Sequence, residues 1–192
     1  MDRKDDFIRI YTAQIKRAGS TELLEWLEET DFFYAPASTR FHGNYEGGLC
    51  EHSVNVYEEM MRLAHAYPEV AKRIKLESAA IVTLLHDLCK IGCYKPCVRR
   101  KQINGVWHNT ASWEFQEDFP YGGHGSKSVY LVQRFMRLTE EEAAAINCHM
   151  GFADRPADDF KLGKVYEVNP LAWLAHVADE SATYIRETTV EI

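Results

Sequence analysis

The chain has 192 residues, 46% of them hydrophobic and 27% charged, which indicates one globular domain over residues 1–192 and excludes a largely disordered chain. Its formal net charge of −7 offers no basic surface to an extended nucleic acid, but a small phosphorylated ligand is allowed where divalent cations bind. No apolar run approaches the roughly 20 residues of a membrane span and no signal-peptide core follows Met1, so we expect no membrane partner and a cytoplasmic location.

The first 46 residues are expected to form two helices and a loop that precede the main helical core. Apolar residues recur at helical spacing over residues 5–18, and a second short helix is predicted over residues 21–29 after Gly19-Ser20. Residues 31–42 are aromatic, contain a proline and lack periodicity, which predicts a packed loop. The rings of this loop either line a pocket or are buried beneath a covering segment.

A long helix is predicted over residues 49–66, and one of its faces combines apolar side chains with His52. His52 therefore points inward, where it is either a hydrogen-bonded core residue or a ligand. Glu59 lies near enough to His52 on the helical wheel to accept a hydrogen bond from it, and is otherwise a solvated charge.

Residues 79–92 are the most informative stretch, an apolar helix interrupted by adjacent His and Asp residues. Read at about 100° per residue, the large aliphatic side chains fall on one side. His86, Asp87 and Lys90 share another side with Thr83 and two alanines. Because ionisable groups are rarely buried without a partner or a metal, this stripe predicts one wall of a functional site.

A β-hairpin around residues 96–116 is predicted within an insert that spans residues 93–123. Asn104-Gly105, flanked by β-forming residues, is the strongest short hairpin signal, and Trp113 and Phe115 continue the second strand. The insert either covers the site or fills surface, and the sequence allows both.

Three of the five cysteines, Cys89, Cys93 and Cys97, recur every four residues, which allows a soft-metal site. Pro96 interrupts the helix, and neither a CxxC pair nor zinc-ribbon spacing is present. The odd number of scattered cysteines favours reduced thiols instead.

Two further histidines lie at predicted helix ends after the hairpin. His124 lies in a Gly-rich turn before a helix predicted over residues 126–137, and the glycines allow close backbone approach. Thr139 begins a capping box, and the helix that follows it ends at His149, which is either a ligand or a favourable partner for the helix dipole.

The last helix is predicted to begin at Asn169-Pro170, after a polar, loop-like stretch over residues 154–167. Asp179 shares one side of this helix with small residues, which leaves room for an ion. The alternative is that Asp179 partners Arg186 or the end of another helix.

In chain order these residues resemble the HD superfamily of metal-dependent phosphohydrolases, whose pattern is H…HD…D. The resemblance runs from about residue 47 to 187, with GGLCEHS around His52, LLHDLCKIG around His86 and HVADESAT around Asp179. FPYGGHG and CHMG are similar to the FPYGHG and HMG segments of small bacterial and phage HD-domain hydrolases, with one additional glycine before His124.

The resemblance implies an all-α helical bundle with a hairpin insertion, in which residues 47–187 form the HD core. It implies that one divalent ion binds His52, His86, Asp87 and Asp179. It further implies that a second ion binds His124 and His149 with Asp87 as the bridging ligand, or else that these two histidines contact substrate phosphate. Such ligands suit Mn, Fe, Co, Ni or Zn, as one ion or two.

The function implied is hydrolysis of a nucleotide or another small phosphoester, with metal-activated water as the nucleophile. Asp87 and Lys90 would be the catalytic residues, and Lys90 would neutralise the substrate phosphate. Basic residues of the hairpin, Arg99, Arg100 and Lys101, either assist or form a solvated strand face. The alternatives are a di-iron oxygenase of the same superfamily and a non-catalytic module that senses nucleotides. No feature of the sequence indicates an oligomeric state.

Overall fold

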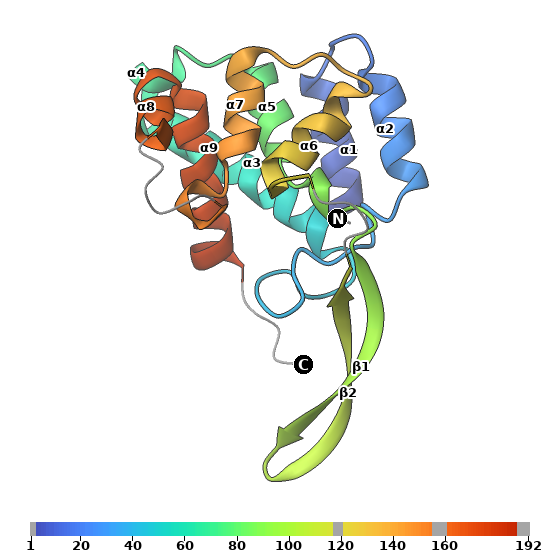
Figure 1. Ribbon diagram of the computed structural model, residues 1–192. Coiled ribbons are helices and arrows are strands. Elements are labelled where there is room, and N and C mark those ends of the chain that lie inside the picture. Colours follow the sequence, from blue (N-terminus) through green and yellow to red (C-terminus); the bar gives the residue numbers. More distant parts are fainter. Residues whose placement is uncertain (1–2, 117–120, 155–160, 188–192) are drawn as a thin grey trace.

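The computed structural model describes residues 3–116, 121–154 and 161–187, which form a bundle of α-helices with one projecting β-hairpin (Figure 1). Within these ranges the α-helices are α1 (Arg3–Gln14), α2 (Ser20–Glu29), α3 (Gly48–Ala66), α4 (Pro68–Ala71), α5 (Leu76–Leu85), α6 (His124–Gln133), α7 (Glu140–Cys148), α8 (Lys161–Val168) and α9 (Pro170–Ser181). The expected all-α fold with a hairpin is confirmed at this level. In the described part of the chain, no helix has the length and hydrophobicity needed to cross a bilayer.

Helix α5 is the centre of the bundle, and it packs against α1, α3, α7 and α9. Its residues from Ser78 to Leu85 are all buried, because the segment is apolar around most of its girth. The continuous helix predicted over residues 79–92 is wrong in one respect. The α-helix ends at Leu85, Asp87 adopts a non-helical φ of −105°, and a short 3-10 turn, η1 (Leu88–Lys90), follows.

The aromatic loop after α2 is divided between core and cavity. Phe32 and Phe33 are buried against Phe7 of α1, with ring centroids 5.0 and 5.5 Å from that of Phe7. Phe41, by contrast, is 70% exposed and lines a cavity described below. Both alternatives for this loop therefore hold, each for a different part of it.

The hairpin is confirmed, with strands β1 (Tyr94–Ile103) and β2 (Val106–Phe115) paired antiparallel. Asn104 and Gly105 have φ values of 51° and 84°, as a two-residue hairpin turn requires. The strands extend away from the bundle, so the tip covers no helix (Figure 1). Only the base of the hairpin, at Tyr94 and Phe115, reaches the cavity.

The C-terminal segments differ in part from expectation. Part of the stretch expected to be loop-like, residues 154–167, is helical, because α8 packs Leu162, Val165 and Tyr166 against the core at helical spacing. Residues 155–160 of that stretch lie outside the described residues. The start of α9 is confirmed, since the side chain of Asn169 accepts a hydrogen bond from the backbone N–H of Ala172.

A buried ion pair links the N-terminal segment to α7. Glu142 is fully buried, and Arg17 donates to both of its carboxylate oxygens, at 2.6 and 2.9 Å. Glu142 also accepts from Ser78 Oγ of α5 at 2.7 Å and completes the capping box with Thr139. Burial opposes ionisation, but the hydrogen bonds from Arg17 and Ser78 outweigh it and lower the pKa of Glu142.

Replacement of this charge should destabilise the fold in a pH-dependent way. The substitution Glu142→Gln keeps the capping contact but removes the charge paired with Arg17, and we expect it to lower the free energy of unfolding by about 3 kcal/mol at pH 7. Because the pKa of Glu142 is lowered in the folded state, its contribution is present above the ordinary carboxyl pKa and is lost as the pH falls. Urea unfolding of wild type and variant should therefore converge in acid. The exposed neighbour Glu141→Gln is the matched control, and an equal loss at pH 4 and pH 7 would contradict this account.

Shortening of the hairpin should leave the bundle intact. In this variant Asn-Gly joins Cys97 directly to Ser112. We expect the four residue pairs at the base of the hairpin, from Tyr94↔Phe115 to Cys97↔Ser112, to be preserved. The free energy of unfolding should change by no more than about 0.5 kcal/mol, because neither strand packs extensively on a helix and the hairpin extends away from the bundle (Figure 1). Urea unfolding monitored by far-UV circular dichroism measures this, and a loss of cooperative folding would show that the tip supports the bundle.

Candidate metal centre

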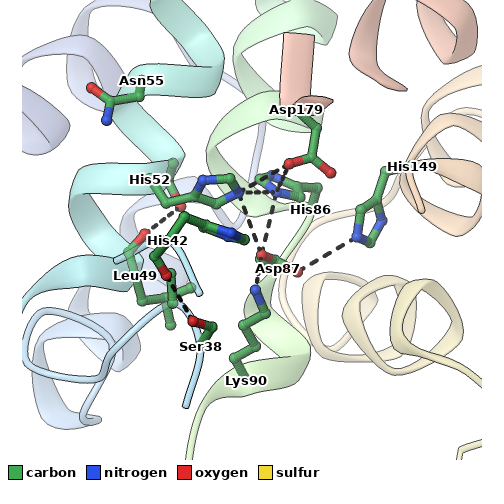
Figure 2. A network of polar contacts seen from close by, with 12 residues as sticks. Ser38, His42, Leu49, His52, Asn55, His86, Asp87, Lys90, His149 and Asp179 are labelled. Atoms are coloured by element: carbon green, nitrogen blue, oxygen red, sulfur yellow. Dashed lines mark hydrogen bonds and ion pairs between the residues drawn. The ribbon is translucent and has the colours of Figure 1, made fainter. Parts of the chain in front are cut away.

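Five buried side chains converge where four helices meet at the middle of the bundle (Figure 2). They are His52 of α3, His86 and Asp87 directly after α5, His149 directly after α7, and Asp179 of α9. None of the five is more than 8% exposed. All belong to the residues predicted as metal ligands, so the structure brings five of those six together.

The ring nitrogens and carboxylate oxygens of this cluster lie within a few ångströms of one another. His52 Nε2 is 3.1 Å from Asp179 Oδ1 and 3.3 Å from His86 Nε2. His86 Nε2 is in turn 3.4 Å from Asp87 Oδ2. Two sets of three ligands each place their atoms within 4.8 Å of one another, and both sets contain His86: His52, His86 and Asp179; and His86, Asp87 and His149. Either set is compact enough to hold an ion.

The other ring nitrogen of each histidine is occupied by an acceptor. His86 Nδ1 lies 2.8 Å from the carbonyl oxygen of Thr83, and His149 Nδ1 lies 2.7 Å from that of Ile146. A carbonyl oxygen only accepts, so each Nδ1 carries the proton and donates it. Both Nε2 atoms are then acceptors or ligands that face the cluster.

This arrangement fits a metal ion. Metal-binding histidines typically donate their second ring N–H to a carbonyl or a carboxylate, which fixes the orientation of the ring. His149 Nε2 is buried, makes no hydrogen bond to any described residue and lies 3.5 Å from Asp87 Oδ1. An ion would satisfy this nitrogen, and imidazole with carboxylate suits a divalent transition metal.

The electrostatics of the cluster favour bound positive charge. Burial opposes ionisation of Asp179, but its hydrogen bond from His52 outweighs burial and lowers the pKa. Lys90 and the neighbouring histidines likewise hold the pKa of Asp87 well below its ordinary value against burial. Burial disfavours the cationic form of His52, yet contacts with Asp179 and Glu187 raise its pKa to about 10. The carboxylates thus stay ionised and attract cations, whether protons on imidazoles or a metal.

Lys90 lies beside this cluster and faces the same cavity. Its ammonium is 2.6 Å from Asp87 Oδ2, and its side chain is 13% exposed. Burial opposes the charge, but Asp87 outweighs it and raises the pKa of Lys90. Lys90 therefore remains a cation within the site.

His124 is the predicted ligand that the structure does not bring into the cluster. It is partly buried, lines the cavity, and its Nδ1 lies 3.6 Å from Cys89 Sγ. Among the described residues it belongs to none of the compact sets of three metal-ligating atoms. Its assignment to a second ion stays a prediction.

The remaining alternatives from the sequence are resolved by their contacts. Arg186 pairs with Glu58 and Glu59, so the suggested ion pair between Asp179 and Arg186 is wrong. Glu59 is directed to Arg62 and Arg186 and is therefore not the acceptor for His52. All five cysteines are free thiols, and in the described ranges none belongs to a compact set of metal ligands.

Sequence reasoning missed three residues around His52, two of which contact its ring. Glu187 accepts from His52 Nδ1, with its oxygens 3.1 and 3.2 Å away, and Asn55 Nδ2 donates to the same carboxylate at 2.9 Å. His42 lies against His52, with ring centroids 4.8 Å apart. The position of Asn55 one turn after His52 was the available signal, whereas Glu187 and His42 arrive from segments without periodicity.

A cavity of about 390 Å³ opens above the cluster. His52, Asp87, Lys90 and Asp179 contribute to its lining, and Phe41, Tyr94, Phe115 and Tyr184 add aromatic surface. Phe41 and Tyr184 are 70% and 77% exposed, so they stand at the mouth. The buried charges are therefore reachable by a small molecule.

No known protein-family model matches the sequence, and comparisons with curated proteins and with solved structures found no match.

Loss of the Glu187 carboxylate should weaken metal binding without removing a ligand. In Glu187→Gln the amide no longer holds His52 Nδ1 as strongly, so we expect affinity for Mn²⁺ or Zn²⁺ to fall about 10-fold to 100-fold. Isothermal titration calorimetry measures the affinity. The control is Glu167→Gln, because Glu167 is exposed on α8. Unchanged metal affinity in Glu187→Gln would show that the contact of Glu187 with His52 does not support metal binding.

Proposed function

We propose that this protein is a metal-dependent phosphoester hydrolase of the HD type, acting on a nucleotide or another small phosphorylated molecule. One observation carries the proposal: three histidines and two aspartates form a compact buried cluster at the floor of a cavity open to small molecules. The order of these residues along the chain and the motifs around them, which resemble the HD superfamily, support it.

In this proposal His52, His86 and Asp179 hold one divalent ion, and Asp87 with His149 provides ligands for that ion or for a second one. Bound there, a divalent transition metal would lower the pKa of water to near neutrality and polarise a phosphoryl oxygen. Water attacks phosphorus as the ester P–O bond breaks, and the departing alcohol oxygen takes up a proton. The products are an alcohol and a phosphate.

The protein supplies orientation and charge around that chemistry. Thr83 and Ile146 fix the rings of His86 and His149 through their carbonyl oxygens, so neither ring has to reorient when it binds an ion. Lys90 balances Asp87, and its place on the cavity wall supports a second contact with a phosphoryl oxygen. The sites of metal and phosphate would then be adjacent.

Removal of the His-Asp pair should abolish hydrolysis. We expect His86→Ala with Asp87→Ala to lower activity at least about 1,000-fold and to lose bound metal, because both ligand sets contain His86. The assay measures metal content by elemental analysis and then screens a phosphoester panel with the metal found. The control His65→Ala changes an exposed histidine near the end of α3. Retained activity in the double variant, or after exhaustive metal removal, would refute the proposal.

Metal analysis and the activity screen, together with EPR and thermal unfolding, separate the two alternatives. Two irons in anaerobically purified protein, a mixed-valence EPR signal and no phosphatase activity would indicate a di-iron oxygenase. Thermal stabilisation by a nucleotide, without product under any metal, would indicate a sensing module.

A further inference from the structure

His42 is a partly buried histidine whose two ring nitrogens have no hydrogen-bond partner among the described residues. Both ring nitrogens are buried, and neither forms a hydrogen bond with any described residue. Buried polar atoms are nearly always hydrogen-bonded, so an unsatisfied imidazole beside a charged cavity calls for a physical account. No contact within the described part of the bundle satisfies either ring nitrogen.

The loop that carries His42 holds it in place through backbone contacts. Ser38 Oγ donates to the carbonyl oxygen of His42 and accepts from the backbone N–H of Phe41, each at 2.8 Å. Ala37 N–H donates to the carbonyl oxygen of Gly43 at 2.8 Å, which closes the loop. Gly43 has a φ of +56°, and a Cβ on Gly48 would lie 2.0 Å from the oxygen of Gly43. The segment therefore packs closely against the start of α3, and these contacts fix the backbone position of His42.

His42 faces the same space as the metal cluster. Its ring lies against that of His52, and it lines the cavity together with Asp87 and Lys90. Figure 2 shows the His42 ring directed from its loop toward the side on which Asp87 and Lys90 lie. A ligand that reaches the floor of the cavity would meet His42 on one wall and Lys90 on another.

A metal-ligand role for His42 is disfavoured by the contacts of its neighbours. His42, His52 and Glu187 do offer three atoms within 4.8 Å of one another. However, His52 Nδ1 already donates to Glu187, and its Nε2 lies 3.1 Å from Asp179. An ion between His42 and Glu187 would have to remove the proton that orients His52. A hydrogen-bonding role for His42 leaves both contacts of His52 intact.

We propose that His42 is a substrate-binding residue that donates a hydrogen bond from its ring to an oxygen of the substrate's phosphoryl group. This inference rests on the proposed function, because it assumes that a phosphoryl group occupies the cavity floor. Both ring nitrogens are buried in this structure, so the ring would turn on binding and bring one of them to the cavity. Lys90, which lines the same cavity, would contact the same phosphoryl group. The loop of residues 37–43 then becomes a phosphate-binding element of this chain.

The test measures the binding of inorganic phosphate to the metal-loaded protein, so it does not depend on finding a substrate. We expect His42→Phe, which keeps a ring but lacks a donor, to weaken phosphate binding about 10-fold. His42→Gln retains an N–H donor and should recover part of that loss. Calorimetric titration gives the affinity, and elemental analysis should give the same metal content as wild type in both variants. His65→Phe is the control, because His65 is exposed on α3.

Each result decides the assignment. Wild-type phosphate affinity in His42→Phe, or equal losses in the Phe and Gln variants at full metal content, would overturn it. Loss of one metal equivalent in both variants would also overturn it and make His42 a ligand. Phosphate binding that depends on His42, in a protein that hydrolyses no ester of the panel, would support His42 as a phosphate contact while refuting the hydrolase proposal. If an ester is hydrolysed, His42→Phe should raise KM more than it lowers kcat.

Discussion

Two carboxylates and three imidazoles share one buried space, and the cost of that burial explains much of the surrounding structure. Asp87 and Asp179 are 3% and 8% exposed, so each needs positive charge or donated hydrogen bonds close by. Lys90 and His52 supply them, at 2.6 and 3.1 Å. Glu187 then balances His52 from outside, and Asn55 holds Glu187. The polar residues at the bundle centre therefore form one connected network rather than separate pairs.

The backbone uses the same local device twice to build this network. His86 and His149 each follow the last residue of a helix, α5 and α7, and each remains in the right-handed helical region of φ and ψ. In both, Nδ1 donates to the carbonyl oxygen three residues earlier, at 2.8 and 2.7 Å. The last carbonyls of a helix lack backbone partners, so the ring satisfies one of them. The same contact directs Nε2 toward the cluster. His149 can therefore both interact with the C-terminal end of α7 and bind a metal.

Sequence reasoning succeeded where the signal is local and failed where tertiary contacts decide. Asn104-Gly105 predicted the hairpin and Thr139 the capping box, because each depends on residues only a few positions apart. The end of α5 at Leu85 was missed, since apolar periodicity continues through η1 while the backbone turns toward α6, where Ser128 accepts from Cys89. Glu187 lies 135 residues from His52 in the sequence, and no sequence pattern predicts their contact. His124 Nδ1 lies 3.6 Å from Cys89 Sγ, and its assignment to a second ion, which rests on the motif around it, stays a prediction.

The two oxygens of Asp87 divide the proposed work of the site. Oδ1 lies nearest His149, at 3.5 Å, while Oδ2 lies 2.6 Å from Lys90 and 3.4 Å from His86. Ligation through Oδ1 with His86 and His149 would leave the pair between Lys90 and Oδ2 intact. Ligation through Oδ2 would instead compete with Lys90 and free its ammonium toward the cavity, where a phosphoryl group would lie. Metal and phosphate affinity would then be linked through one carboxylate, and by thermodynamic reciprocity each would strengthen the other.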